Sequence, residues 1–172
     1  LDDWERMGFG GMWRYGAIGA RGKLDLRAGF SDLEYTNNRE ETYLQDRDWF
    51  FYGGTFYWRV APKTSVLADV LYTDINYDNA DYLNSEETSW MLGITWDASA
   101  RTSGTIRYGD QKKTYADPLI EDYSGPTWMA SINWRPRTYS TFNLTATRRT
   151  QEPDANALYV VAQDISLAWI HE

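Results

Sequence analysis

The chain has 172 residues, no cysteine and a formal net charge of −8, with 25 acidic against 17 basic side chains. The negative balance argues against a nucleic-acid partner, because phosphate binding requires clustered lysine and arginine in excess. The lack of cysteine excludes disulfides, thiolate metal sites and cysteine catalysis. Aromatic residues make up 16% of the chain, yet no apolar run approaches the roughly 18 residues that a membrane helix requires.

Apolar and polar residues alternate along nearly the whole chain, whereas helical spacing is almost absent. Alternation of this kind predicts strands with one apolar face each. We expect nine strands, with apolar faces at about 7–15, 24–30, 50–58, 66–72, 90–96, 104–108, 128–134, 142–146 and 159–169. Alternation alone does not separate a soluble sandwich from a membrane barrel.

The connections between these strands are of two kinds that take turns along the chain. Short basic turns are expected near 16–23, 60–64, 97–102 and 135–139, and longer acidic loops near 36–47, 78–87, 112–124 and 150–157. Transmembrane barrels have this asymmetry, with short turns at one end and long loops at the other. Trp58, Trp96 and Trp134 recur at intervals of 38 residues, which fits one hairpin per repeat.

Aromatic residues mark both ends of the predicted apolar faces. Near the short turns they are Trp13, Trp58, Trp96, Trp134 and Trp169, and near the long loops they include Phe50, Trp90 and Trp128. Tryptophan and tyrosine prefer the headgroup level of a bilayer, whereas a soluble core would place such residues in the middle of its strands. The sequence therefore predicts an all-β, transmembrane, antiparallel up-and-down barrel, with residues 1–172 forming a single barrel region.

The opposite faces of the same strands carry polar and ionisable residues. On the lipid side an arginine at the midplane costs about 2–4 kcal/mol, so we expect these residues to face the lumen. Arg and Asp on neighbouring strands can pair, and they are candidates either for solute contacts or for structural struts. The predicted lumen residues are Arg6, Arg14, Asp25, Arg27, Asp69, Arg107, Asn133 and Asp164.

Signals for catalysis are weak. His171 is the single histidine, so neither a histidine-based triad nor a multi-histidine metal site can be assembled. Acidic residues are plentiful but are concentrated in loops, without the paired arrangement that a glycosidase requires. We therefore predict no catalytic residues, no metal ligands and no cofactor.

Two stretches carry a resemblance to a known family, YSGPTWMASINWRPRTYSTFNLTATRRTQE (123–152) and YVVAQDISLAWIH (159–171). They contain a GP pair before a strand-opening Trp, a W-x-P-R-T turn, a TRRTQE strand end and a W-x-H segment. Earlier copies of the turn are WRVAPKTS (58–65) and WDASARTS (96–103). In these features residues 47–172 resemble the EpsL-like outer-membrane proteins, a β-barrel porin group found with exopolysaccharide and capsule synthesis clusters of Gram-negative bacteria.

The resemblance implies an outer-membrane barrel that assists polysaccharide export, with no catalytic residues to carry over. Implied partners are outer-membrane lipid and lipopolysaccharide, the polysaccharide and export-machinery proteins. In that group the W-x-H segment leads into further hairpins, and single-chain bacterial barrels use even strand numbers. We therefore expect part of a larger barrel, trimmed, incompletely traced or closed by other strands or chains.

Three other interpretations remain open. The first is a general diffusion porin for small solutes, which would use the same strands. The second is a structural or adhesive surface barrel whose lumen is sealed by Arg and Asp pairs. The third is a soluble carbohydrate-binding β-protein.

Overall fold

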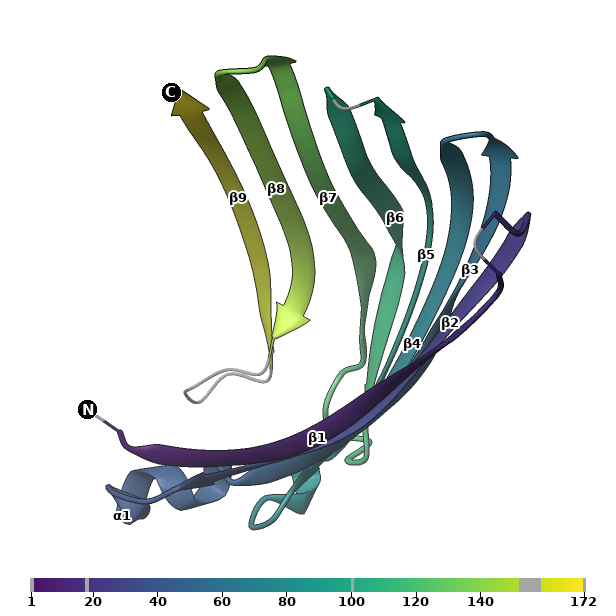
Figure 1. Ribbon diagram of the computed structural model, residues 1–172. Helices are drawn as coiled ribbons and strands as arrows, with labels where there is room; N and C mark the ends of the chain where they lie inside the picture. The colour runs from purple at the N-terminus through teal and green to yellow at the C-terminus, as the bar shows by residue number, and fades with distance from the viewer. Residues whose placement is uncertain (1, 18, 100, 152–158, 172) are drawn as a thin grey trace.

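A computed structural model describes residues 2–17, 19–99, 101–151 and 159–171. In these ranges nine strands form one antiparallel sheet whose order follows the chain (Figure 1). This confirms the predicted all-β, up-and-down architecture. The strands are β1 (Trp4–Tyr15), β2 (Gly22–Tyr35), β3 (Arg47–Ala61), β4 (Thr64–Tyr77), β5 (Ser85–Ser99), β6 (Thr102–Tyr115), β7 (Tyr123–Arg137), β8 (Ser140–Gln151) and β9 (Val160–His171).

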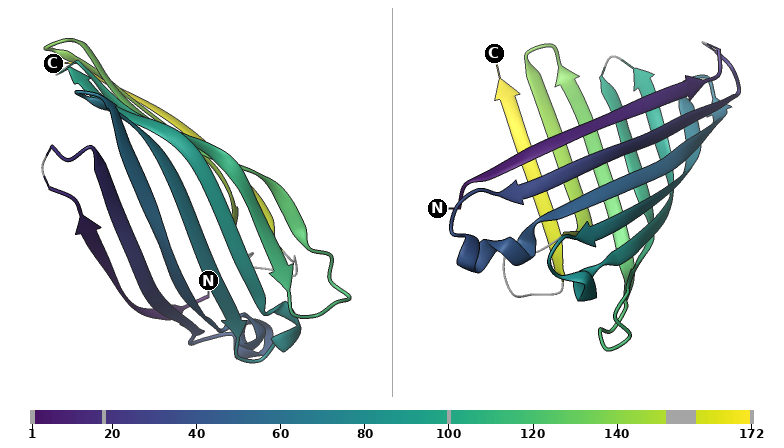
Figure 2. Two further views of the ribbon diagram at one scale, coloured as in Figure 1. Left: turned by 90° about the vertical axis from the view of Figure 1, so that its right-hand side faces the viewer. Right: turned by 90° about the horizontal axis from the view of Figure 1, so that it is seen from below.

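The sheet curls into an open trough, and the strand direction rotates progressively from β1 to β9 (Figure 2). Each strand pairs with its neighbours in sequence, so β1 and β9 are the two edges of the described sheet. The described helical elements are short: α1 (Arg39–Thr42), η1 (Tyr43–Gln45) and η2 (Asp81–Leu83). In the described residues, no helix is both long and apolar enough to cross a membrane.

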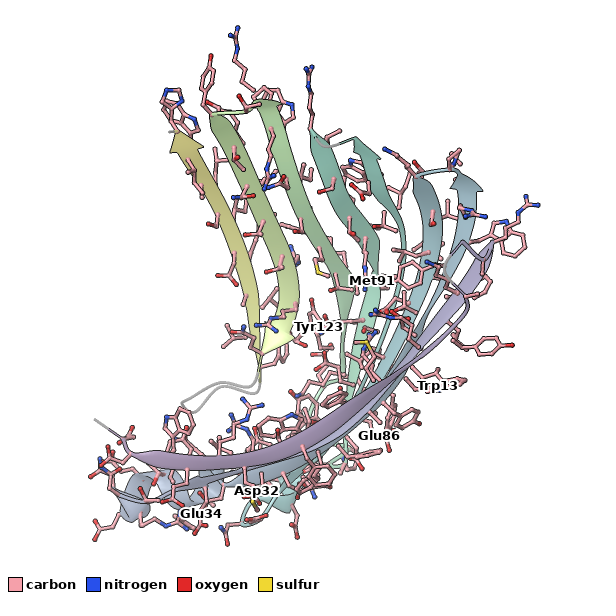
Figure 3. The ribbon with its side chains drawn as sticks, in the orientation of Figure 1. Trp13, Asp32, Glu34, Glu86, Met91 and Tyr123 are labelled. Carbon is pink, nitrogen blue, oxygen red and sulfur yellow. The ribbon has the colours of Figure 1, made fainter. Side chains whose placement is uncertain are left out.

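The burial pattern is inverted relative to that of a water-soluble protein. On β4 and β5, Asp69 is 1% exposed and Leu92 is 59% exposed. The apolar face lies on the convex side of the trough, where Figure 3 shows Trp13, and the polar face lines the concave side. Large apolar side chains are exposed on β1–β7 and β9, and an exposed apolar surface of this extent suits the apolar solvent that a bilayer provides.

The register explains why the tryptophans recur every 38 residues. Trp58 pairs with Val66, which pairs with Ile94, and Trp96 lies two residues beyond Ile94. The same step leads from Trp96 to Trp134. Successive tryptophans are two strands apart, about 9.6 Å across the sheet, and are offset by two residues, about 6.6 Å along the strand. They therefore lie at one height when the strands tilt by about 35° from the barrel axis, as strands in barrels do.

Trp58, Trp96 and Trp134 form a level row, but Trp13 and Trp169, which were predicted to belong to the same girdle, do not lie at its level. Continuing the step backwards from Trp58 leads to Tyr15, and forwards from Trp134 it leads to His171. Trp13 and Trp169 precede these positions by two residues along β1 and β9, so each lies farther from the short-turn end than the row does. Their exposed fractions, 58% and 63%, still place them on the open convex surface.

The loops predicted at 78–87 and 112–124 are shorter than expected, because β5 begins at Ser85 and β6 continues to Tyr115, whereas residues 152–157 of the loop predicted at 150–157 lie outside the described residues. At these strand ends the convex-face positions are polar, as at Glu86 and Lys112. The alternation of apolar residues therefore stops, although the backbone pairing of β5 and β6 continues. Each described loop is closed by an Asx side chain just before the next strand, which accepts the backbone N–H of the tyrosine ending the previous one. The pairs are Tyr35 with Asp46, Tyr77 with Asn84 and Tyr115 with Asp122.

Candidate functional site on the concave face

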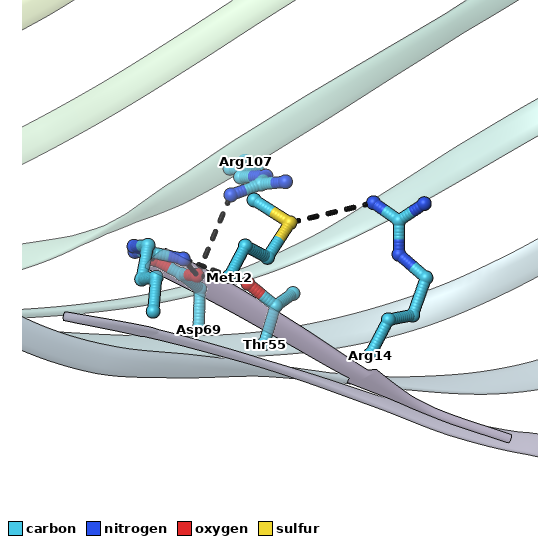
Figure 4. Close-up of polar contacts among 6 residues, drawn as sticks. Met12, Arg14, Thr55, Asp69 and Arg107 are labelled. Carbon is cyan, nitrogen blue, oxygen red and sulfur yellow. Dashed lines mark hydrogen bonds and ion pairs between the residues drawn. The ribbon is translucent and has the colours of Figure 1, made fainter. Parts of the chain in front are cut away.

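The middle of the concave face holds an ionic network centred on Asp69. The guanidinium of Arg27 donates two hydrogen bonds to the Asp69 carboxylate, of 2.9 and 3.0 Å. Thr55 donates a third through its hydroxyl. Arg107 approaches the same carboxylate from the other side, with its Nη1 atom 3.5 Å from Oδ2 (Figure 4). Asp69 therefore lies between two arginines, and its side chain is 1% exposed.

A glycine lies opposite each arginine of this network on the strand that the arginine crosses. Arg27 on β2 reaches Asp69 on β4 over β3, where its register partner is Gly53. Arg107 on β6 reaches Asp69 over β5, where its partner is Gly93. A Cβ on Gly93 would lie 3.0 Å from the Arg107 Cγ atom and 2.3 Å from a backbone oxygen. Glycine inside a strand commonly marks such a close approach.

The other predicted lumen residues lie apart from this network. Arg14 forms an ion pair of 3.0 Å with Asp25, its register partner on β2. Arg6 donates to the Ser31 hydroxyl at 3.2 Å and lies over the Trp49 ring. Asn133 donates to Asn143 at 2.5 Å between β7 and β8. Asp164 lies opposite Thr147 on the exposed edge strand β9.

A second polar cluster joins β5, β6 and β8 nearer the long loops. Gln111 donates to Glu87 at 2.9 Å, and Thr150 donates to the same Glu87 oxygen at 2.9 Å. The backbone N–H of Thr150 also donates to the side-chain Oε1 atom of Gln111 at 3.4 Å. Lys113 beside them is fully buried, with its ammonium 5.5 Å from the centre of the Tyr115 ring.

Residues 78–87, 112–124 and 150–157 were expected to be loops, so this cluster was not predicted from the sequence. Its signal is the two-residue period itself, since Glu87, Gln111 and Lys113 continue the face that bears Arg107. Within the described ranges, no group of three or more Asp, Glu or His side chains is placed to hold a metal ion. The concave face thus offers charged and hydrogen-bonding groups for a solute.

Residues 14–168 match the sequence profile of the family described as "Putative beta-barrel porin 2". The chain belongs to this β-barrel porin family. The match includes residues 14–46, which lie outside the range 47–172 that carries the resemblance to the EpsL-like proteins. No curated protein matches the sequence. Membership of the porin family indicates an outer-membrane location and favours a non-enzymatic role.

The porin sheet carries opposite charge on its two faces. Over β1–β6 the register places mainly basic side chains on the concave face, where Asp25, Asp69, Glu87 and Asp97 are the acidic ones. The basic residues there are Arg6, Arg14, Lys23, Arg27, Arg47, Arg59, Arg107 and Lys113. The convex face has Lys112 as its basic residue and carries acids near the long loops, namely Glu5, Asp32, Glu34, Asp48, Asp74, Glu86 and Asp110. The concave face of β1–β6 is therefore predominantly basic, although the net charge of the whole chain is −8.

Proposed function

We propose that this porin forms part of the wall of an outer-membrane channel in a Gram-negative bacterium, and that the channel is a passive path for an exported polysaccharide. The observation that carries the proposal is the division of the sheet into an exposed apolar convex face and a polar concave face. The convex face suits acyl chains, and the concave face suits water and hydroxyl groups. The aromatic rows would hold the channel at a fixed depth.

Polysaccharide as the solute rests on two further features. Residues 123–152 and 159–171 resemble the EpsL-like proteins of exopolysaccharide and capsule clusters. The concave sides of β7 and β8 also carry neutral hydrogen-bonding groups, including Ser131, Asn133, Asn143 and Thr145. Such groups exchange hydrogen bonds with sugar hydroxyls as readily as with water, which favours passage over tight binding.

Closure of the channel requires more strands than the described sheet contains. The outer backbone groups of β1 and β9 would be unpaired in lipid, at a cost of several kcal/mol for each group. We propose that further strands, from the same polypeptide or from other chains, pair with these edges. Export-machinery proteins would contact the exposed ends of the completed barrel.

Conductance in planar bilayers, combined with polymer addition, tests the proposal. A polysaccharide path predicts open-channel currents that a long polysaccharide blocks from one side, with longer block for longer chains. A general diffusion porin predicts currents that fall with solute size and are insensitive to dilute polymer. Absence of any conductance from the reconstituted protein would contradict both kinds of channel.

The network around Asp69 favours a second candidate, a structural surface barrel whose lumen is closed by ion pairs. Arg27, Arg107 and Asp69 span five strands of the sheet and cross its concave centre. In that case removal of the carboxylate would open a path, so Asp69→Asn would increase conductance from near zero. In the channel proposal the wild-type protein conducts already.

Lipid is a proposed partner on the convex side. Apolar side chains between the tryptophans at the short turns and the aromatic residues near the long loops, Phe50, Trp90 and Trp128, would contact acyl chains. The acidic residues nearer the long loops would face lipopolysaccharide through bridging divalent cations. Added magnesium should then raise the thermal stability of the protein in lipopolysaccharide-containing vesicles. The same addition should have a smaller effect in zwitterionic detergent.

A further inference from the structure

We propose that the short-turn end of the concave face binds the carboxylate groups of an acidic saccharide, at a site formed by Lys23, Arg59 and Lys63. The inference rests on the proposed channel function and names the class of solute that the channel would admit. We call this site the turn-end vestibule. It is separate from the network around Asp69.

The vestibule is a hollow of about 420 Å³ among the ends of β2–β5 and their turns. Lys23 and Arg59 contribute from the concave face, and Lys63 contributes from the turn between β3 and β4. Arg59 extends beneath the first turn, with its Nη1 atom 4.0 Å from the position that a Cβ on Gly19 would occupy. Lys23, Arg59 and Lys63 therefore come from three segments and border one cavity together with Arg21, whose guanidinium lies over the Trp58 ring.

Lys23, Arg59 and Lys63 lack the acidic partners that three other arginines of the concave face have. Arg14, Arg27 and Arg107 are each held by Asp25 or Asp69. In the part of the chain that the structure describes, Lys23, Arg59 and Lys63 form no ion pair and no side-chain hydrogen bond. Asp97 is the acidic residue of the lining. The charge of the vestibule is thus available to an external anion.

The remaining lining is suited to a sugar ring. Tyr57 lies directly opposite Lys23 in the register, so an aromatic ring adjoins a cation. Ser65 lies opposite Arg59 in the register, and Thr95 lies opposite Ser65, so two hydroxyl-bearing residues from β4 and β5 also line the cavity. An aromatic ring accepts the apolar face of a sugar, hydroxyls bond its polar edge, and cations bond a carboxylate. Together these groups favour a uronate over a neutral sugar or a simple anion.

The electrostatic potential of the surrounding sheet also favours the binding of an anion. Basic residues dominate the concave face over β1–β6, and the acidic residues of those strands are concentrated on the convex face. A cleft lined by one sign of charge concentrates ligands of the opposite sign. The net charge of −8 would by itself predict the opposite preference, namely for cations.

Calorimetric titration of the purified membrane protein in uncharged detergent tests the site without requiring conductance. The probes are tetragalacturonate, maltotetraose of the same length, and inorganic phosphate. We expect tetragalacturonate to bind at least about tenfold more tightly than either control, as charge-assisted bonds to the carboxylates predict. The affinity should fall as salt is raised. Equal binding of maltotetraose would overturn the charge requirement, and equal binding of phosphate would overturn the saccharide requirement.

Variants connect the binding to these residues. The triple substitution Lys23→Gln, Arg59→Gln and Lys63→Gln should abolish the preference for tetragalacturonate, whereas Lys112→Gln on the convex face should retain it. Arg59→Lys, which keeps the charge, should retain most of the affinity. Heat-modifiable gel migration checks that each variant is folded, and unchanged binding by a folded triple variant would refute the site.

Bilayer measurements separate this inference from the channel proposal. Reversal potentials in a salt gradient should show anion preference that the triple variant reduces, and cation preference of the wild-type channel would contradict the inference. Binding of tetragalacturonate without conductance would refute the channel and leave the site. Conductance without such binding would refute the site and leave the channel.

Discussion

Arg27 on β2 holds Asp69 on β4 through two parallel hydrogen bonds of 2.9 and 3.0 Å, reaching over β3 at Gly53. The bond pair fixes the distance between two strands that are not neighbours. Arg107 approaches the same carboxylate from β6 over Gly93, in an ion pair of 3.5 Å. The curvature of the trough is thus held by side chains as well as by the backbone ladder.

Removal of the shared carboxylate should destabilise the protein. Asp69→Asn leaves Arg27 and Arg107 without their counter-ion, and breaking a buried ion pair by removing one partner costs about 3–5 kcal/mol. Unfolding in urea from detergent or vesicles measures the change. Asp164→Asn on the exposed face of β9 is the matched control and should have little effect. Equal loss in both variants would contradict the bracing role of Asp69.

The glycine under Arg107 should tolerate no side chain. Gly93→Ala would bring its Cβ to 2.3 Å from the Ile106 backbone oxygen, and overpacking of this kind costs about 1–3 kcal/mol. Gly11→Ala is the control, because a Cβ there meets nothing within 4 Å. We expect a lower urea midpoint for Gly93→Ala and an unchanged one for Gly11→Ala. Similar midpoints would show that the sheet can shift to make room.

Two adjacent residues on β5 test which face meets lipid. Leu92 is 59% exposed on the convex face, whereas Met91 lies on the concave face beside Asp69 in the register. Leu92→Arg should cost about 2–4 kcal/mol for folding into bilayers, as an arginine on the lipid side of a barrel does. Met91→Arg should cost less, because the concave face is wet. A larger loss from Met91→Arg would reverse the assignment of the faces.

Like charges oppose each other near the long loops. Asp74 is the register partner of Glu86 on the convex face, and directly opposite like charges destabilise a strand pair. Asp74→Asn should therefore raise the melting temperature at low salt, by a gain of less than about 1 kcal/mol that salt screening removes. Thr88→Asn, on the same face without a charge change, should have no such salt dependence. A lower melting temperature for Asp74→Asn would show that the carboxylate has a stabilising partner.

The sequence by itself determined the strands and their two faces. Alternation with a period of two follows from the pleat, so Leu92 and Asp69 could be assigned to opposite faces without coordinates. The recurrence of Trp58, Trp96 and Trp134 gave the hairpin repeat, because each hairpin must cross the same apolar thickness. Membership of a porin family agrees with both features.

Only the tertiary structure decided which polar residues meet. Arg27, Asp69 and Arg107 lie on alternate strands, and their contact depends on register, on sheet curvature and, for Arg107, on the room left by Gly93. The polar ends of β5 and β6 extend beyond the apolar alternation, so Glu87 and Lys113 looked like loop residues. Alternation reports the solvent on each side of a strand, whereas contacts across strands depend on stagger and curvature, which no local pattern encodes.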